Sequence, residues 1–251
     1  MKYLHQKKLL LFIFTLSLFY SCNHKKEYSG SDNFSTTKIE INNGKWILIG
    51  DLTYPKNKDS VSLVVLFNKA FGNRTAYKKL TKQLSKKGIA SLNIDLRGHG
   101  ESINAGRFVP RKVPKDPIIW DAEKDIIAVQ KYIVDTLPFK VKKLGVLGSS
   151  YSGEEMAEAG RIFQFADAYV TLSPGSFSNE SISGIDKSKV PWFFITSKNE
   201  RYLKEITKSV QKQSQNVELL IVPGKKHASD LLENNKNLTE IIAVWFKNNL
   251  K

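Results

Sequence analysis

The sequence predicts a single α/β domain with a mostly parallel central β-sheet and helices on both faces. Short apolar runs alternate along the chain with longer stretches of helical apolar spacing. Several of these runs are apolar throughout, as in parallel strands that are buried on both faces. Hydrophobic residues make up 41% and charged residues 25% of the 251 positions, which is typical of a globular protein. A single cysteine excludes an intramolecular disulfide and a cysteine-based zinc site.

Eight strands are expected. A hairpin opens the domain, with strands at residues 38–41 and 46–52 around the turn signal Asn42-Asn43-Gly44. Six further apolar runs predict the parallel strands, at residues 62–67, 89–94, 143–147, 167–172, 192–196 and 217–222.

Helices are expected between these strands, at residues 76–87, 118–137, 150–163, 201–213 and 229–249. Gly88 is a plausible C-cap of the first helix, and Pro138 ends the second. Residues 173–189 are rich in Ser, Gly and Asn, which favours an irregular loop. That segment is too short for a large lid domain, so we expect an open site.

The first 21 residues predict an export signal. Three lysines precede the apolar run 9–20, whose helical length of about 18 Å is short against a hydrocarbon core of roughly 30 Å. Phe19-Tyr20-Ser21-Cys22 resembles the lipobox of bacterial lipoproteins. The resemblance implies cleavage before Cys22, acylation of Cys22, and a membrane-anchored protein of the bacterial cell envelope that faces the periplasm or the exterior. An uncleaved anchor and an ordinary signal peptide with an incidental cysteine are the alternatives.

Residues 22–36 are polar and predict a flexible tether, so residues 37–251 form the folded domain. The net charge of +15 comes mostly from lysines spread through helical stretches. They lack the interleaved aromatic residues that stack bases, so we expect a solvated basic surface and no nucleic-acid partner. Attraction to anionic lipid headgroups is the alternative for this charge.

A serine-rich turn separates the strand at 143–147 from the following helix. Gly148-Ser149-Ser150-Tyr151-Ser152-Gly153 has the setting of a nucleophile elbow, where small residues two places before and after the serine let strand and helix approach closely. Ser150 meets this requirement, with Gly148 and Ser152 as its flanks. Ser149 is flanked by Leu147 and Tyr151, which are too large. The flanks of Ser152, Ser150 and Glu154, also fit poorly.

Two other strand ends carry motifs. Asp95-Leu96-Arg97-Gly98-His99-Gly100-Glu101-Ser102 resembles the D-x-R-G-H-G-x-S segment of the α/β-hydrolase family, and Ser150 follows His99 by 51 residues, as in that family. Val222-Pro223-Gly224-Lys225-Lys226-His227 resembles its strand-end histidine loop. The resemblance covers residues 46–250. It implies an α/β-hydrolase fold and a serine hydrolase that needs no cofactor and no metal.

The family's triad runs in the order Ser, acid, His along the chain. His227 is therefore the expected general base for Ser150, in preference to His99, which precedes the nucleophile. Glu200 stands where the family has the acid of a G-x-x-D turn, directly after the strand at 192–196. Asp186 and Asp230 are the rival acids.

The oxyanion hole needs two backbone N–H donors. The residue after the nucleophile, Tyr151, is expected to supply one. Ala70, in the loop after the strand at 62–67, is expected to supply the other, with Lys69 and Phe71 as alternatives. Many relatives have His-Gly in this loop, whereas this chain has Asn68-Lys69-Ala70.

These observations predict a lipid-anchored serine hydrolase that cleaves a small-molecule acyl substrate through an acyl-enzyme. A carboxylic ester is the expected substrate, with a thioester or an amide left open. The alternative is a non-catalytic binding lipoprotein on the same scaffold. The missing His-Gly, Ser152 at a usual Gly position and Glu200 in place of Asp leave room for it.

Overall fold

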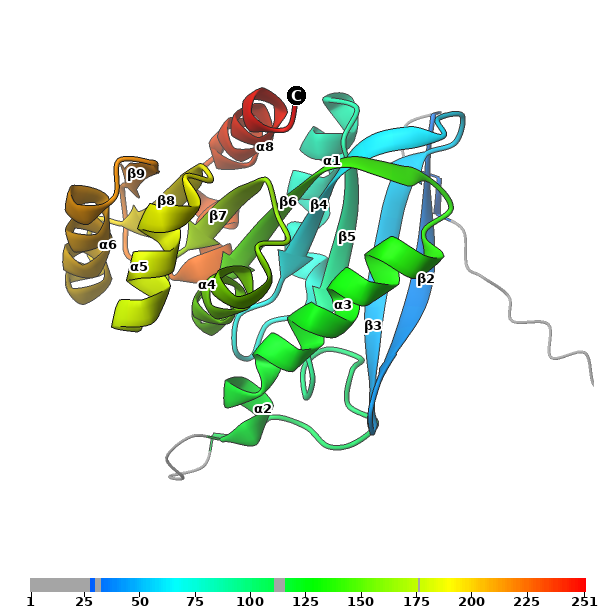
Figure 1. The fold of residues 1–251 in the computed structure, drawn as a ribbon, viewed down its shortest axis with the longest axis horizontal. Helices are drawn as coiled ribbons and strands as arrows, with labels where there is room; N and C mark the ends of the chain where they lie inside the picture. Colours follow the sequence, from blue (N-terminus) through cyan, green and yellow to red (C-terminus); the bar gives the residue numbers. More distant parts are fainter. Residues whose placement is uncertain (1–27, 30–32, 111–115, 176) are drawn as a thin grey trace, which may run out of the picture.

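The computed structural model describes residues 28–29, 33–110, 116–175 and 177–251. Within them, one nine-stranded sheet has the order β1-β2-β3-β5-β4-β6-β7-β8-β9 (Figure 1). The strands are β1 (Tyr28–Ser29), β2 (Phe34–Asn43), β3 (Trp46–Pro55), β4 (Ser60–Phe67), β5 (Ala90–Asp95), β6 (Lys140–Ser149), β7 (Ala168–Leu172), β8 (Trp192–Ser197) and β9 (Val217–Val222). The predicted α/β class is confirmed.

The strand pairing changes from antiparallel to parallel at β5. Strands β1, β2, β3 and β5 pair antiparallel, whereas β5, β4, β6, β7, β8 and β9 pair parallel. β4 lies between β5 and β6, so the chain leaves β4 for one neighbour and then crosses back to the other. The carboxyl ends of all six parallel strands therefore meet at one edge, which is where open α/β sheets bind ligands.

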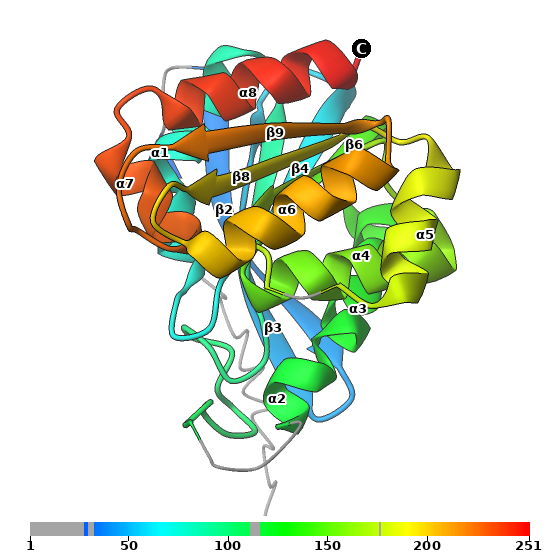
Figure 2. The same ribbon diagram turned by 90° about the vertical axis from the view of Figure 1, so that its left-hand side faces the viewer.

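Helices cover both faces of the sheet (Figure 2). One face carries α1 (Lys78–Lys86), α7 (Leu231–Asn234) and α8 (Leu238–Asn249), and the other carries α3 (Ala122–Thr136), α4 (Tyr151–Phe163), α5 (Asn179–Ser188) and α6 (Arg201–Gln213). Short helical turns complete the described chain: η1 (Arg74–Tyr77), α2 (Pro117–Trp120) and η2 (Ala228–Asp230). No lid domain is inserted among the described residues.

The apolar strands supply both layers of the core because their side chains alternate between the faces. Leu63 and Val65 of β4 belong to the cluster under α3 and α4, whereas Val64 and Leu66 belong to the cluster under α1 and α8. All four side chains are at most 1% exposed. This two-sided burial explains why the parallel strands are apolar throughout and do not alternate with polar residues.

The segment predicted as an irregular loop, residues 173–189, contains helix α5, so that prediction was wrong. Ser178 is its N-cap and accepts a hydrogen bond from the Ser181 N–H at 3.0 Å. Ile185 supplies the buried anchor on the inner side of the helix. A capping serine and one apolar face are enough to form the helix here, despite a composition that favours turns.

The expected helix at 229–249 is interrupted. It is replaced by η2, α7 and α8, with a break at Asn235-Lys236-Asn237. The Asn235 side chain donates to the Leu231 carbonyl at 2.9 Å, and its own carbonyl accepts from Leu238 N–H. Asparagine competes in this way with the backbone bonds of a continuing helix. The expected helix at 118–137 is likewise divided at Asp121 into α2 and α3.

The folded domain begins earlier than the predicted boundary at residue 37. β2 starts at Phe34, whose side chain is 7% exposed, and Tyr28 pairs with Thr36. The predicted tether therefore contributes its last residues to the sheet. The predicted signal peptide and Cys22 lie outside the described residues. Every helix in the described ranges is too short or too polar to span a membrane.

Carboxylates gather where α3 and α4 pack together. Glu155 of α4 lies near Glu123 of α3 and near Glu154 and Glu158 of its own helix. Burial, reinforced by these three carboxylates, raises the pKa of Glu155 to about 8. Glu158 differs because Arg161 donates to it, which lowers its pKa.

We expect Glu155→Gln to stabilise the fold at pH 8 and to have little effect at pH 5. Between the unfolded pKa near 4.5 and the folded pKa near 8, the unfolded chain loses this proton while the folded chain keeps it. Stability therefore falls as pH rises through this window, and a neutral glutamine avoids the loss, worth about 1–3 kcal/mol at pH 8. Urea unfolding at both pH values measures the difference.

Glu158→Gln is the matched control. Its folded pKa is lowered, so the stability that it contributes is present at neutral pH and disappears in acid. This variant should gain nothing at pH 8. Equal stabilisation by Glu155→Gln at pH 5 and pH 8 would contradict the assignment of a raised pKa to Glu155.

Candidate active site

Three strand ends bring the predicted triad residues together at the carboxyl edge of the sheet. Ser150 follows β6, Glu200 lies in the turn after β8, and His227 lies in the loop after β9. His227 Nδ1 lies 2.6 Å from Glu200 Oε1, and His227 Nε2 lies 2.9 Å from Ser150 Oγ. Because a carboxylate only accepts, Nδ1 carries the proton, and Nε2 is left as the acceptor for the serine hydroxyl.

The backbone holds Ser150 in a strained conformation, with φ 57° and ψ −124°. Left-handed φ values of this kind cost a non-glycine residue on the order of 1–3 kcal/mol and cluster at functional sites. A Cβ at Gly148 would lie 2.6 Å from the Ser152 carbonyl oxygen and 2.7 Å from Gly153 Cα. Strand β6 and helix α4 therefore approach too closely for any side chain at Gly148, as the size argument for the elbow requires.

The neighbouring serines have other partners. Ser149 Oγ donates to Tyr77 Oη at 2.6 Å, and Tyr77 Oη donates to the Phe67 carbonyl at 2.6 Å. Ser152 Oγ accepts from the Ser149 N–H at 2.7 Å and lies 3.2 Å from the Phe67 carbonyl oxygen. Both serines are fully buried. Ser152 thus occupies a usual glycine position because its hydroxyl has backbone partners there.

Glu200 is held from several sides. Its Oε2 accepts from the Ser197 N–H at 2.9 Å, from the Ser173 hydroxyl at 2.8 Å and from the Thr196 hydroxyl at 3.1 Å. Burial alone raises the pKa of Glu200, but the hydrogen bonds from His227, Ser197 and Ser173 outweigh it, and the net pKa is lowered. The carboxylate therefore stays charged at neutral pH, beside the imidazole that it orients.

Ser173 is a site residue that the sequence analysis missed. It is fully buried at the end of β7, where its hydroxyl donates to Glu200 and accepts from the Ala228 N–H at 2.9 Å. It thereby joins the acid to the residue after His227. Its place directly after a strand was the available signal, but it lay in the segment predicted as an irregular loop.

The rival acids and the rival histidine have other settings. Asp230 pairs with Lys69, with 2.8 Å between Oδ2 and Nζ. Asp186 lies near the end of α5, just before β8 begins. It is therefore at the amino edge of the sheet, opposite the triad. His99 Nδ1 donates to the Arg97 carbonyl at 2.8 Å, and its ring stacks on Tyr151. The structure pairs His227, not His99, with Ser150.

The predicted oxyanion donors lie at the start of α4 and in the loop after β4. Tyr151 is the first residue of α4, where helical N–H groups have no partner within the helix. Ala70 lies within a tight turn closed by a 2.9 Å hydrogen bond from Gly72 N–H to the Lys69 carbonyl. Phe71 in this turn has φ 58°. That these groups bind an oxyanion stays a prediction.

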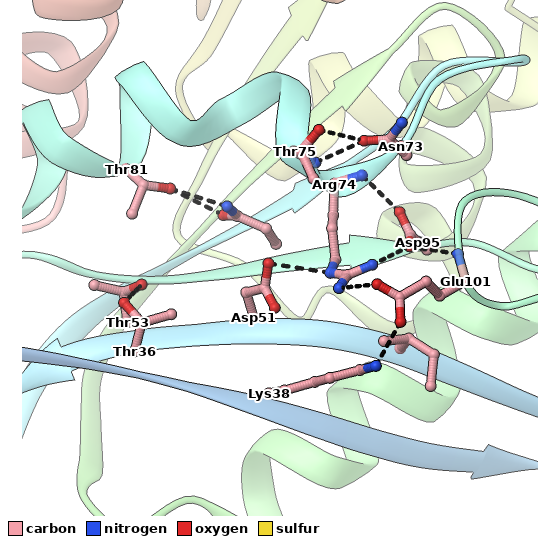
Figure 3. Close-up of polar contacts among 12 residues, drawn as sticks. Thr36, Lys38, Asp51, Thr53, Asn73, Arg74, Thr75, Thr81, Asp95 and Glu101 are labelled. Carbon is pink, nitrogen blue, oxygen red and sulfur yellow. Dashed lines mark hydrogen bonds and ion pairs between the residues drawn. The ribbon is translucent and has the colours of Figure 1, made fainter. Parts of the chain in front are cut away.

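An ion cluster centred on the buried Arg74 fastens this loop to the sheet (Figure 3). The Arg74 N–H donates to Asp95 Oδ1 at 2.6 Å, and the Arg74 guanidinium contacts Asp95, Glu101 and Asp51. Glu101 also pairs with Lys38. Asp95 is the first residue of the D-x-R-G-H-G-x-S segment and is fully buried. The segment thus anchors the loop after β4.

A cavity of about 430 Å³ lies between the loops that follow β4 and β5. Phe71, His99, Arg107 and Phe108 are among its lining residues. The ring of His99 stacks on that of Tyr151, with 5.7 Å between the ring centroids, but no triad residue lines the cavity. Within the described ranges, no group of three or more His, Cys, Asp or Glu side chains is arranged to hold a metal ion.

No protein-family model and no curated protein matches this sequence. Solved structures do resemble it. Dienelactone hydrolase from Anabaena variabilis superposes with a TM-score of 0.72 and 17% identity, over 87% of this chain and 100% of that one. Est1E from Butyrivibrio proteoclasticus with ferulic acid bound gives 0.69 and 20%, over 84% and 99%. The Pyrococcus furiosus esterase Pf2001 gives 0.64 and 19%, over 87% and 94%. The chain has the α/β-hydrolase fold.

Proposed function

We propose that this protein is a serine hydrolase that cleaves carboxylic esters through an acyl-enzyme. One observation carries the proposal: an unbroken hydrogen-bonded path runs from Ser150 Oγ through His227 to Glu200, with lengths of 2.9 and 2.6 Å. Serine, imidazole and carboxylate in this order are the parts of nucleophilic acyl transfer, recognised by geometry and not by sequence position. The His227 side chain is 42% exposed and accessible to substrate, whereas the Glu200 side chain behind it is 10% exposed.

The proposed reaction has two halves. Ser150 Oγ attacks the acyl carbon and passes its proton to His227 Nε2, and the N–H groups of Tyr151 and Ala70 bind the resulting oxyanion. The C–O bond to the alcohol then breaks as His227 returns the proton to the leaving oxygen. Water then gives a proton to His227 and attacks the acyl carbon of the acyl-enzyme. The bond to Ser150 Oγ breaks as His227 returns the proton to this oxygen, and the carboxylic acid leaves. Glu200 remains charged and stabilises the imidazolium in both halves.

Esters are the favoured substrates within this chemistry, ahead of thioesters and amides. One of the similar structures is described as an esterase and another as a dienelactone hydrolase. The cavity between the loops that follow β4 and β5 is of a size that accepts a small organic acyl or alcohol group. Its aromatic residues, Phe71 and Phe108, favour a group with substantial apolar surface.

We place the enzyme at the bacterial cell envelope, anchored through acylated Cys22. The support is the sequence: a basic start, a short apolar run, and the sole cysteine directly after Ser21. Multiple acyl chains anchor a protein stably without a membrane-spanning helix.

The wild-type protein should hydrolyse 4-nitrophenyl acetate, and Ser150→Ala should abolish turnover while the unfolding temperature stays within a few degrees. The kcat/KM values for thioester and anilide analogues with the same acyl group, compared with that for the ester, show which of the three bonds is cleaved most efficiently. Ser214→Ala is the control, because it makes the same chemical change at the end of α6, away from the triad. A wild-type protein that binds esters without releasing nitrophenol would instead support the non-catalytic binding lipoprotein.

Glu200→Gln should lower kcat by about 10² to 10⁴, since the amide keeps the size but loses the charge that stabilises the imidazolium. KM should change little, because the carboxylate lies behind the histidine. Steady-state kinetics on one activated ester measure both constants.

Asp186→Asn makes the same chemical change away from the site and should keep wild-type kcat. Near-normal kcat in Glu200→Gln, together with collapse in Asp230→Asn, would transfer the acid role to Asp230. Undiminished kcat in both would indicate a Ser-His dyad.

Intact-mass measurement of protein extracted from membranes should show a chain that starts at Cys22 and carries acyl groups. Cys22→Ser should release the protein from the membrane fraction without changing hydrolysis by the folded domain. A chain that starts at another residue, or an unmodified Cys22, would contradict the anchor.

A further inference from the structure

We infer that Asn68 is a positioning residue that orients the Ala70 N–H toward the oxyanion. The inference rests on the proposed function and deepens it, because it assigns a role to a residue that departs from the His-Gly pattern expected from the resemblance to α/β-hydrolases. Asn68 directly follows β4 and is 1% exposed.

Both ends of the Asn68 amide are engaged. Its Oδ1 accepts from the Leu96 N–H at 2.8 Å, and its Nδ2 donates to the Lys69 carbonyl at 2.8 Å. Because an N–H can only donate, the Leu96 bond fixes which end of the amide is oxygen and directs the NH₂ group to Lys69. Leu96 follows Asp95, so Asn68 ties the oxyanion loop to the D-x-R-G-H-G-x-S segment.

The Lys69 carbonyl has two donors. Gly72 N–H reaches the same oxygen at 2.9 Å. Lys69 C=O and Ala70 N–H belong to one peptide unit, and no cis peptide bond occurs among the described residues. In a trans planar peptide the carbonyl and the N–H point in opposite directions. Two donors on the carbonyl therefore direct the Ala70 N–H away from Asn68 and Gly72.

The second donor matters because the turn is strained. Phe71 holds φ 58°, a conformation that costs a non-glycine residue about 1–2 kcal/mol. With Gly72 alone on the Lys69 carbonyl, the strained turn has one restraint against relaxing. Asn68 adds a restraint from a fully buried position, so the Ala70 N–H is already oriented when the oxyanion forms. Such preorganisation is what makes an oxyanion donor effective.

The test compares Asn68→Ala and Asn68→Asp with the wild type on 4-nitrophenyl acetate. Asn68→Ala removes both bonds without adding charge. Asn68→Asp keeps the shape and the acceptor for Leu96 but has no N–H for the Lys69 carbonyl, so it preserves the test if the alanine variant does not fold. We expect kcat to fall about 10- to 100-fold in both, with KM within about threefold, because the misplaced donor acts in the transition state.

Inhibition by phenylboronic acid supplies a second readout. Ser150 Oγ adds to the boron, its proton passes to His227, and a hydroxyl oxygen of the resulting anionic tetrahedral boronate occupies the oxyanion hole. In both variants the inhibition constant should rise by about the factor by which kcat falls. A loss of packing alone does not produce this match. Asn216→Ala is the matched control, because the Asn216 amide also donates to backbone carbonyls, those of Ile185 in α5 and of Val190, at the opposite edge of the sheet.

Wild-type kcat and boronate affinity in folded Asn68→Ala or Asn68→Asp would overturn the role of Asn68 and leave the proposed function intact. An equal loss of kcat in Asn216→Ala would also overturn it, because the effect would then be structural. A wild-type protein with neither turnover nor boronate binding would overturn the proposed function, and the role of Asn68 with it.

Discussion

The close approach of β6 to α4 is the constraint on which the site depends. Gly148 and Gly153 leave no room between strand and helix, and the chain reverses direction there by placing Ser150 at positive φ. Hydrogen bonds offset the strain: Ser150 N–H donates to the Leu172 carbonyl at 2.9 Å, and Gly153 N–H donates to the Ser150 carbonyl at 2.9 Å. The serine hydroxyl is thereby raised above the sheet, within reach of an imidazole from another strand.

Buried polar groups extend this constraint to the neighbouring loops. Beneath the elbow, the hydroxyls of Tyr77 and Ser152 reach the Phe67 carbonyl, at the point where β4 passes into the oxyanion loop, and the Ser149 hydroxyl donates to Tyr77. Farther along that loop the anchor is ionic, because Arg74 is buried against carboxylates (Figure 3). Removing one partner of such a pair leaves an uncompensated buried charge, which costs several kcal/mol. The loop is therefore held at its start by hydroxyls and at its end by charges.

Sequence patterns predicted the parallel strands and three site residues because both follow from local rules. Runs buried on both faces must be apolar, and Ser150, Glu200 and His227 each lie in the turn or loop that follows such a run. Geometry brings all three together, while their catalytic roles stay predictions. The approximate start of the domain and helix α5 were harder to predict, since Phe34 gains its burial from strand pairing and α5 from one capping serine. Ser173 and Asn68 act through contacts with distant loops, which one-dimensional spacing does not encode.

The most direct measurement of the central claim is the position of a fluorophosphonate label. The account predicts one adduct, on Ser150, because among the three serines of the elbow only Ser150 bonds to His227, while Ser149 and Ser152 are buried. Cleavage after Lys143 and Arg161 releases all three serines in one peptide, residues 144–161, so fragment-ion spectra must assign the site. An adduct on Ser150 that disappears in His227→Ala agrees with the account. An adduct on Ser149 or Ser152, or no adduct on the folded protein, would contradict it.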